Sequence, residues 1–176
     1  MLSDSGASQP VLDDHDKRII RETSGGTTTY AGSKSGKKGL IDSPADAGGL
    51  ESFPTTTRPS TWDADNDGIA DWWDGSTGGA GYTELEGYLN FMADPHSYVS
   101  PSKSVSIDLA ALATGFKSPT FTTSGPTKGT VSVSGTKATY TAGSSAGIDY
   151  ISIVIKDSEG STWTRKYGIA IYAGAN

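Results

Sequence analysis

Apolar and polar residues alternate with a period of two from about residue 104 to the end of the chain. The runs that alternate in this way cover residues 105–109, 131–133, 138–140, 151–155 and 169–171. Turn-forming residues, including Ser134–Gly135 and Ala142–Gly143, separate the runs. Because successive residues of a strand point to opposite faces, this pattern predicts roughly six or seven short antiparallel strands. We expect a mainly β protein in which residues 102–176 form a β-sandwich of immunoglobulin-like architecture. Gly168 is a candidate for a bulge in the last strand.

The period changes to that of a helix in one segment before these strands. Its apolar positions share one helical face and are Leu85, Tyr88, Leu89 and Met92. Thr83 and Glu86 have the spacing of a capping box, which marks the first turn of a helix. Pro95 is expected to end the helix. Trp72 and Trp73 are predicted to lie in a short helix just upstream, where at least one of them covers this apolar face.

An acidic loop at residues 63–74 immediately precedes the helix. Its carboxylates stand at loop positions 1, 3, 5, 9 and 12, with Gly68 at position 6, which is close to the arrangement of an EF-hand calcium loop. The departure is at position 12, where the EF-hand has a glutamate and Asp74 is one carbon shorter. So many carboxylates would repel one another unless a cation lay between them. The sequence therefore predicts one structural Ca²⁺. Its predicted ligands are Asp63, Asp65, Asp67, the backbone carbonyl of Ile69, Asp71 and Asp74.

A second calcium loop, centred on Gly81 and starting at Ser76, has lost nearly all its oxygen ligands. We therefore expect one calcium ion rather than two. Whether Glu84 or Glu86 completes the first site is left open by spacing alone.

The first sixty residues show little periodicity. Residues 16–22 are expected to form one or two helical turns, which the glycine pair Gly25–Gly26 ends. Residues 54–59 read as an extended Thr/Pro linker. A segment so poor in apolar residues cannot stabilise a core alone, so it is either disordered or packed on a surface supplied by another domain. The predicted division is an irregular segment at 1–60, a calcium loop–helix unit at 61–97 and the sandwich at 102–176.

Composition narrows the possible functions. The chain has 23 glycines, 8 prolines and only 34% hydrophobic residues, which argues against a helical bundle. It has no cysteine, which excludes disulfides and thiolate metal sites. Residues 1–101 carry 7 basic and 16 acidic side chains, whereas residues 102–176 carry 7 and 4, giving a net charge of −6 overall. A mildly basic module on an acidic chain suggests a polyanionic partner for that module, or chance scatter.

The first residues lack the basic flank and apolar stretch of a signal peptide, and no run is apolar enough to span a membrane. An acidic calcium loop in a chain rich in glycine, serine and threonine fits an extracellular protein. We expect a monomeric fragment of a longer secreted protein, without a membrane or nucleic-acid partner.

Three stretches resemble the C-terminal part of secreted bacterial pectate lyases of the family-one polysaccharide lyase type. They are segment 16–49, the calcium loop with Trp72–Trp73, and the Gly-Tyr-Thr helix at 81–90. The resemblance implies that the chain is a non-catalytic appendage to a lyase domain in cis. The β-helix that carries the lyase chemistry is absent, and the degenerate second loop departs from relatives that keep two. The loop is also similar to those of dockerins, which bind scaffold proteins.

The predicted sandwich resembles homogalacturonan-binding modules and, equally, generic cadherin-like and immunoglobulin-like repeats. The resemblance to the pectin-binding modules implies that lysines of this chain contact uronate carboxylates. The candidate ligand-binding residues here are Lys117, Lys128, Lys137, Lys156, Lys166 and, as a stacking platform, Trp163. Lys137, Lys156 and Lys166 are expected to share one sheet face. The alternatives are a calcium-braced spacer without a ligand and a dockerin-like protein-binding unit.

Catalysis by this chain is not predicted. His15 and His96 each lie near aspartates, an arrangement that can make a general base. No activated nucleophile accompanies either histidine, and both fall in predicted loops. We therefore expect both to be solvated.

Overall fold

The computed structural model describes residues 12–53, 55 and 57–175. Residues 1–11 of the predicted irregular segment, and Pro54 and Thr56 of the predicted linker, lie outside the described residues. The chain divides into two compact units, one ending at Thr56 and the other beginning at Thr57. The predicted loop–helix segment and the predicted sandwich thus belong to the same unit.

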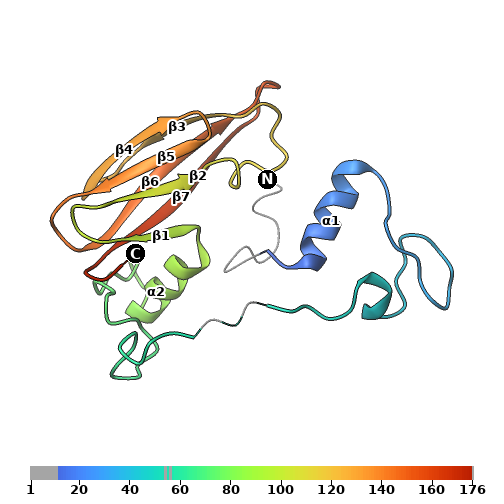
Figure 1. The fold of residues 1–176 in the computed structure, drawn as a ribbon, viewed down its shortest axis with the longest axis horizontal. Coiled ribbons are helices and arrows are strands. Elements are labelled where there is room, and N and C mark those ends of the chain that lie inside the picture. The colour runs from blue at the N-terminus through green and yellow to red at the C-terminus, as the bar shows by residue number, and fades with distance from the viewer. Residues whose placement is uncertain (1–11, 54, 56, 176) are drawn as a thin grey trace. The chain divides into compact units, whose positions relative to one another are not determined.

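The N-terminal unit contains helix α1 (Asp14–Gly25) and the short 3₁₀ helix η2 (Pro44–Ala47) (Figure 1). The α1 helix begins earlier than predicted because the Asp13 side chain caps it, accepting the Asp16 N–H at 2.6 Å. It ends, as predicted, at the glycine pair, where Gly26 adopts a left-handed conformation with φ of 61°.

Carboxylates organise the loop of this unit. Asp46 accepts the backbone N–H groups of Ser33, Asp42 and Ser43 at 2.8–3.1 Å. The hydrogen bond from Ser33 and then that from Asp42 contribute most to lowering the pKa of Asp46 to about 2. Asp42 in turn accepts two backbone N–H groups from residues 34 and 35. Polar contacts therefore hold this loop in shape.

Apolar packing contributes little to the described part of the N-terminal unit. None of its described large apolar side chains is buried. Several are instead well exposed: Ile19, Leu40, Ile41, Leu50 and Phe53. This agrees with the expectation that the segment cannot build a core of its own.

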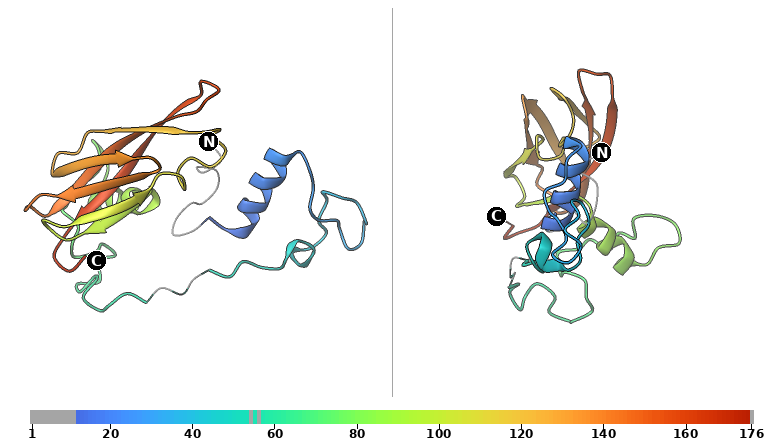
Figure 2. Two further views of the ribbon diagram at one scale, coloured as in Figure 1. Left: turned by 45° about the horizontal axis from the view of Figure 1, so that its top comes forward. Right: turned by 90° about the vertical axis from the view of Figure 1, so that its right-hand side faces the viewer.

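The C-terminal unit is a β-sandwich, which confirms the predicted fold class (Figures 1 and 2). Seven strands of the described chain form two sheets, ordered β1-β7-β6-β3 and β2-β5-β4. Their bounds are β1 His96–Val99, β2 Ser104–Asp108, β3 Thr120–Ser124, β4 Gly129–Ser134, β5 Lys137–Ala142, β6 Gly147–Lys156 and β7 Thr162–Ile171. All the pairs are antiparallel except β1 with β7. No helix of the described residues is long and apolar enough to span a membrane.

The core lies between the two sheets and includes the predicted inward positions of β5 and β6. Ile151, Ile153 and Ile155 of β6 are fully buried, and so are Ala138 and Tyr140 of β5. The alternate residues of the same strands face outward, as the period of two requires.

One buried carboxylate fixes the turn that leads into β4. Asp149 accepts the N–H groups of Thr127, Lys128 and Tyr150 and the Thr127 and Tyr140 hydroxyls, at 2.7–3.0 Å. Burial favours a raised pKa for Asp149, but the hydrogen bonds outweigh it and lower the pKa. The charge is therefore compensated inside the sandwich.

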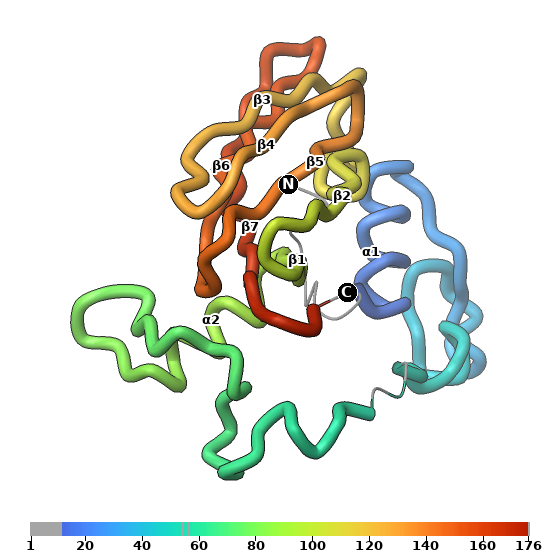
Figure 3. The backbone as a smooth tube through the Cα atoms, turned by 60° about the vertical axis from the view of Figure 1, so that its left-hand side comes forward, coloured from blue at the N-terminus to red at the C-terminus, as the bar shows by residue number. Residues whose placement is uncertain are grey.

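The outer face of the four-stranded sheet is covered at one end by helix α2 (Glu84–Ala93). The helix buries Gly87, Tyr88 and Phe91. Tyr88 is buried as predicted, and Met92 packs against the buried cluster, but Leu85 and Leu89 are 40% and 54% exposed, so the prediction is wrong for these two residues. The buried face is rotated because Gly87 lies against the backbone of residues 76 and 77, too close for any side chain. Figure 3 shows the irregular segment that precedes the helix.

Gly168 is the contact point between the helix and the sheet. The predicted bulge at this position is wrong, because the β6–β7 pairing is continuous and Gly168 pairs with Tyr150. A Cβ atom at Gly168 would collide with the Phe91 ring, with Cδ2 only 2.9 Å away. The glycine therefore makes room for an aromatic ring on the sheet.

We expect Gly168→Ala to destabilise the C-terminal unit by about 1–3 kcal/mol, because overpacking forces the Phe91 ring or the β7 backbone to shift. Urea unfolding monitored by tryptophan fluorescence measures the change. Gly79→Ala is the matched control, since its added Cβ meets only Tyr82, at 3.6 Å. Equal stability of Gly168→Ala and the parent protein would contradict the proposed contact.

Candidate functional site

The acidic loop is closed at its base by its own backbone. The Asp71 N–H donates to the Trp62 carbonyl at 2.8 Å, which connects loop position 9 to the residue just before the loop. Within the loop, Asp63 accepts the N–H groups of Asp67 and Gly68, both at 3.1 Å. Gly68 has a φ of 88°, which explains why position 6 of the loop is a glycine.

Three of the predicted metal ligands converge. One carboxylate oxygen from each of Asp63, Asp65 and Asp71 lies within 4.8 Å of the others. Asp65 and Asp71 are exposed and Asp63 is half-buried. Hard oxygen ligands in a short loop are the kind that Ca²⁺ and Mg²⁺ use, although Ca²⁺ requires six to eight oxygens in all. The three carboxylates are thus a candidate for part of a cation site.

The other predicted ligands lie outside this group of three. Asp67 accepts the Ile69 N–H at 2.8 Å, which forms a local turn. Asp74, predicted at loop position 12, accepts the N–H of Ser76 at 3.2 Å and that of Ile148 at 2.8 Å. Because Ile148 belongs to β6, Asp74 connects the loop to the sandwich.

The two glutamates left open by the sequence also lie elsewhere. Glu86 accepts the Thr83 N–H and hydroxyl at 2.7 and 2.9 Å, which completes the predicted capping box. The backbone bond from Thr83 is the largest cause of its lowered pKa. Glu84 lies near Gly75, with Oε1 3.7 Å from the position of an added Cβ atom.

Aromatic side chains attach the loop to the sheet. Trp72 and Trp73 both contact Tyr88 and Phe91 of α2, with ring centroids 5.4–6.0 Å apart. The two indoles lie in a turn rather than in the predicted short helix. A buried cluster formed with Ile148 and Ala170 of the outer sheet face joins the loop, the helix and the sandwich.

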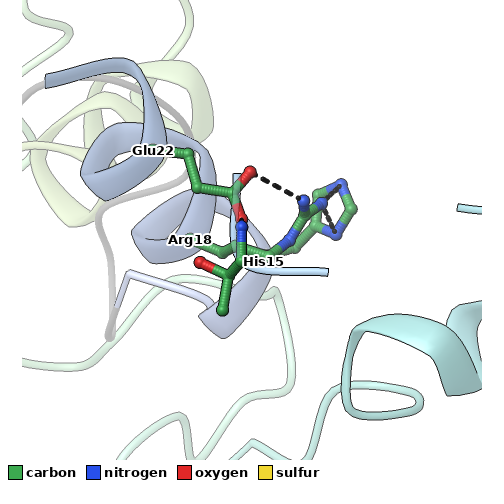
Figure 4. A network of polar contacts seen from close by, with 4 residues as sticks. His15, Arg18 and Glu22 are labelled. Carbon is green, nitrogen blue, oxygen red and sulfur yellow. Dashed lines mark hydrogen bonds and ion pairs between the residues drawn. The ribbon is translucent and has the colours of Figure 1, made fainter. Parts of the chain in front are cut away.

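Neither histidine lies in a loop, so both predicted positions are wrong. His96 is in β1, and its ring contacts Phe91 at a centroid distance of 5.1 Å. Burial lowers the pKa of His96, which favours the neutral ring. His15 is exposed on α1, and its ring lies 3.3 Å from an Arg18 nitrogen (Figure 4). Arg18 also pairs with Glu22 at 3.4 Å.

The predicted ligand-binding lysines do not share one face. Lys137 lies on β5 of the three-stranded sheet, directly between Asp108 and Ser134 on its neighbours. Lys156 and Lys166 lie on β6 and β7 of the other sheet. The expectation that all three lie together is therefore wrong, because Lys137 belongs to a strand of the opposite sheet.

The remaining candidates lie at other places on the unit. Lys117 pairs with Glu159 at 3.1 Å. Lys128 approaches Asp74 beside Gly147, where an added Cβ atom would stand 2.9 Å from Lys128 Nζ and 3.2 Å from Asp74 Oδ2. Trp163 packs against the sandwich core and is not placed as an exposed stacking platform.

Lys156 and Lys166 share the uncovered half of the outer sheet face. Lys166 pairs across the strands with Ser152, and Lys156 pairs with Thr162 and Thr120. The Lys166 ammonium lies 3.7 Å from the centre of the Tyr150 ring. Sequence reasoning did not find this contact, since it depends on the register that places Gly168 opposite Tyr150 and Lys166 beside it.

Comparison with known proteins leaves the family open. No family model matches the chain, and no curated protein matches it. One similar solved structure is a nucleoside hydrolase-related hypothetical protein from Saccharophagus degradans that is associated with carbohydrate metabolism. It is 20% identical over 46% of this chain and 23% of its own length, with a TM-score of 0.36. The PKD domain from the KIAA 1837 protein is 17% identical over 47% of this chain and 86% of its own, with a TM-score of 0.35. Scores this low support no conclusion about fold or function.

We expect Asp74→Ala to destabilise the metal-free C-terminal unit by about 1–3 kcal/mol, because the buried Ile148 N–H loses its acceptor. Asp65→Ala is the matched control, since it removes an exposed carboxylate from a group of like charges and should be neutral or slightly stabilising in EDTA. Urea unfolding in EDTA measures both variants. If Asp74→Ala were as stable as Asp65→Ala, Asp74 would not anchor the loop.

Proposed function

We propose that the chain is a non-catalytic polysaccharide-binding region of a secreted protein, and that its sandwich binds an acidic polysaccharide of the pectin type. The ligand class is homogalacturonan with few methyl esters. The observation that carries this proposal is the pair Lys156 and Lys166 on a sheet face without acidic residues.

The uncovered half of the outer sheet face carries cationic and neutral side chains only. Its outward positions on three adjacent strands are Thr120, Thr122, Ser124, Ser152, Val154, Lys156, Thr162, Thr164 and Lys166. Two of these side chains are cationic and none is acidic, although the whole chain has a net charge of −6. Lys137, by contrast, faces Asp108 across the strands. A polyanion would therefore meet attraction on the first face and partial cancellation on the second.

The spacing of the two lysines suits a polymer. Lys166 lies opposite Ser152 of β6, and Ser152 is four residues from Lys156 on the same strand. Four residues correspond to roughly 13 Å along a strand. An extended uronate chain presents one carboxylate on every sugar, so it can meet both ammonium groups at once. Each exposed pair contributes on the order of 0–1 kcal/mol. Affinity must therefore come from several weak contacts along one chain.

Calcium is proposed to be structural. Asp63, Asp65 and Asp71 supply three of its oxygens, and backbone carbonyls and water would complete the shell. The ion would neutralise the repulsion among these carboxylates and stabilise the loop that carries Trp72 and Trp73. In this proposal it does not contact the polysaccharide on the lysine face.

A catalytic lyase domain in cis rests on the sequence resemblance of residues 16–92. The exposed apolar side chains of the N-terminal unit, such as Leu50, which is 86% exposed, support a neighbouring domain that covers them. A ligand-free spacer is the alternative if the lysine face binds nothing. A dockerin-like function would require two calcium loops, each with a cluster of carboxylates, but the described residues contain one such cluster.

We expect Lys156→Ala and Lys166→Ala each to weaken binding to an oligogalacturonide about twofold to fivefold, because each removes one exposed ion pair. The double variant should lose about tenfold. Isothermal titration calorimetry with short oligogalacturonides in EDTA measures these effects without calcium cross-linking of the ligand.

Lys137→Ala is the matched control, since it changes the net charge equally on the opposite sheet. Higher salt should weaken the parent interaction, and a neutral glucan should not bind. No binding of any oligogalacturonide would remove the pectin proposal. Equal losses in Lys137→Ala and Lys166→Ala would show that only net charge matters.

We expect calcium to raise the melting temperature of the parent protein. With a Kd of about 10⁻⁴ M, typical of extracellular modules, calcium at 100 Kd would add about 2.7 kcal/mol of stability. Differential scanning fluorimetry with calcium and with EDTA measures the shift. Asp65→Asn should abolish it, and Asp74→Ala should retain it. Loss of the shift in Asp74→Ala would instead support the sequence prediction of a ligand at position 12, and no shift in the parent protein would reject the calcium proposal.

A further inference from the structure

Two clefts lie on either side of Trp62, at the base of the acidic loop. One has a volume of about 530 Å³, and its walls include Trp62, Trp72 and Tyr172. The other, of about 520 Å³, is lined by Trp62, Arg58 and Asp63 among others. Pro59 borders both clefts. None of the side chains on the lysine face lines either cleft, so the clefts are a separate feature of the same unit.

The aromatic walls are held in fixed orientations. Trp72 stacks on Tyr172 with ring centroids 5.3 Å apart and an angle of 12° between the planes. Trp62 meets Trp72 edge to face at 5.5 Å and Tyr98 at 6.0 Å. Backbone hydrogen bonds from the Trp62 N–H to Pro59 and from the Asp71 N–H to Trp62 fix the chain on both sides. Such a site orders few side chains on binding, which lowers the entropic cost.

Polar groups border the aromatic walls of the first cleft. Thr61 and Asp71 are lining residues of this cleft, and both are exposed. The indole N–H groups of Trp62 and Trp72 are buried and lack a hydrogen-bond partner among the described residues. The Trp163 indole N–H, which lines neither cleft, is likewise buried and without a partner, so the polar groups that the first cleft offers to a ligand are those of Thr61 and Asp71.

This combination matches a pyranose ring better than a lipid or an anion. A sugar ring has an apolar C–H face that covers an aromatic surface, and hydroxyl groups at its edge that meet carboxylate and hydroxyl partners. An acyl chain would cover the exposed Asp71 and Thr61 side chains without offering them a hydrogen bond in return. A uronate would meet Asp71 in the first cleft and Asp63 in the second, and these carboxylates with Asp65 keep a net charge of −1 even when one Ca²⁺ is bound (−3 + 2). Among the described residues, Arg58 is the one cation on the lining of either cleft.

We propose that the Trp62–Tyr172 cleft is a second carbohydrate site, which takes a neutral pyranose of a polysaccharide. Trp62 and Tyr172 provide the apolar walls. The Asp71 carboxylate accepts hydrogen bonds from sugar hydroxyls, and the Thr61 hydroxyl donates to or accepts from them. The second cleft continues the surface past Trp62, so that a neighbouring sugar of the same chain meets Arg58, whose guanidinium lies 4.7 Å from the centre of the Trp62 ring.

The test uses the whole chain at a fixed, saturating calcium concentration, because Asp71 also belongs to the proposed ion site. Cellohexaose, xylohexaose and a β-1,4-galactohexaose are titrated separately while tryptophan fluorescence is followed. The series is repeated in EDTA with hexagalacturonate as the charged comparison, because calcium would cross-link that ligand. At least one neutral hexasaccharide should bind and change the fluorescence. Trp62→Ala and Tyr172→Ala should each weaken that binding about tenfold, as expected for loss of a central aromatic contact.

Conservative and distant variants control for misfolding. Trp62→Phe should retain most of the affinity, because a smaller ring still covers the sugar face. Tyr82→Ala, which removes a 53% exposed tyrosine outside both clefts, should bind as the parent protein does. The Lys156→Ala, Lys166→Ala double variant should also bind the neutral ligand normally, so a failed pectin proposal and a failed cleft proposal give different results.

Three outcomes would overturn the inference. The first is the absence of binding by every neutral hexasaccharide at millimolar concentration. The second is binding that Trp62→Ala and Tyr172→Ala leave unchanged while the variants remain folded. The third is preferential binding of hexagalacturonate that depends on Trp62, because it would contradict the charge argument and make the cleft part of the uronate site.

Discussion

The packing of aromatic side chains on one end of a sheet determines how this unit is built. Phe91 lies where Gly168 leaves a gap in the outer face of β7, and the indoles of Trp72 and Trp73 pack against the same ring. A sandwich normally leaves its outer faces to solvent, but here half of one face is an interior. The acidic loop is therefore held on the sheet by apolar contacts and by Asp74, whether or not an ion is bound.

This attachment explains the different roles of the loop carboxylates. Asp74 is directed to the β6 backbone and Asp67 to its own turn, so neither takes part in the convergent group. Asp63, Asp65 and Asp71 remain close together, with oxygens within 4.8 Å of one another. The aspartates at the EF-hand positions of this loop therefore have different roles. Asp67 and Asp74 shape and anchor the loop only. Asp63 and Asp71 also accept backbone N–H groups within the loop, but together with Asp65 they produce a concentrated negative charge that favours a cation.

The sequence predicted the fold better than the site. Alternation identified the inward residues of β5 and β6, because a period of two leaves no freedom about which side chains face the core. The alternation did not predict where Lys137 lies relative to Lys166, because it does not determine which strands belong to the same sheet. Helical period likewise favoured Leu85 and Leu89, whereas the buried face follows Gly87 and Phe91. Only the close approach of residues 76 and 77 to Gly87 determines that rotation.

The cleft at Trp62 is another feature that sequence periodicity does not predict, for a physical reason. Its walls come from residues 62, 72 and 172, which no local pattern connects. The parallel pairing of β1 with β7 brings Tyr98 beside Ala170, near the end of β7. The Tyr98 ring contacts all three walls, those of residues 62, 72 and 172. The aromatic packing that anchors the loop therefore also forms the cleft walls. A single arrangement of rings can stabilise the unit and, at its exposed edge, present a surface suited to a sugar.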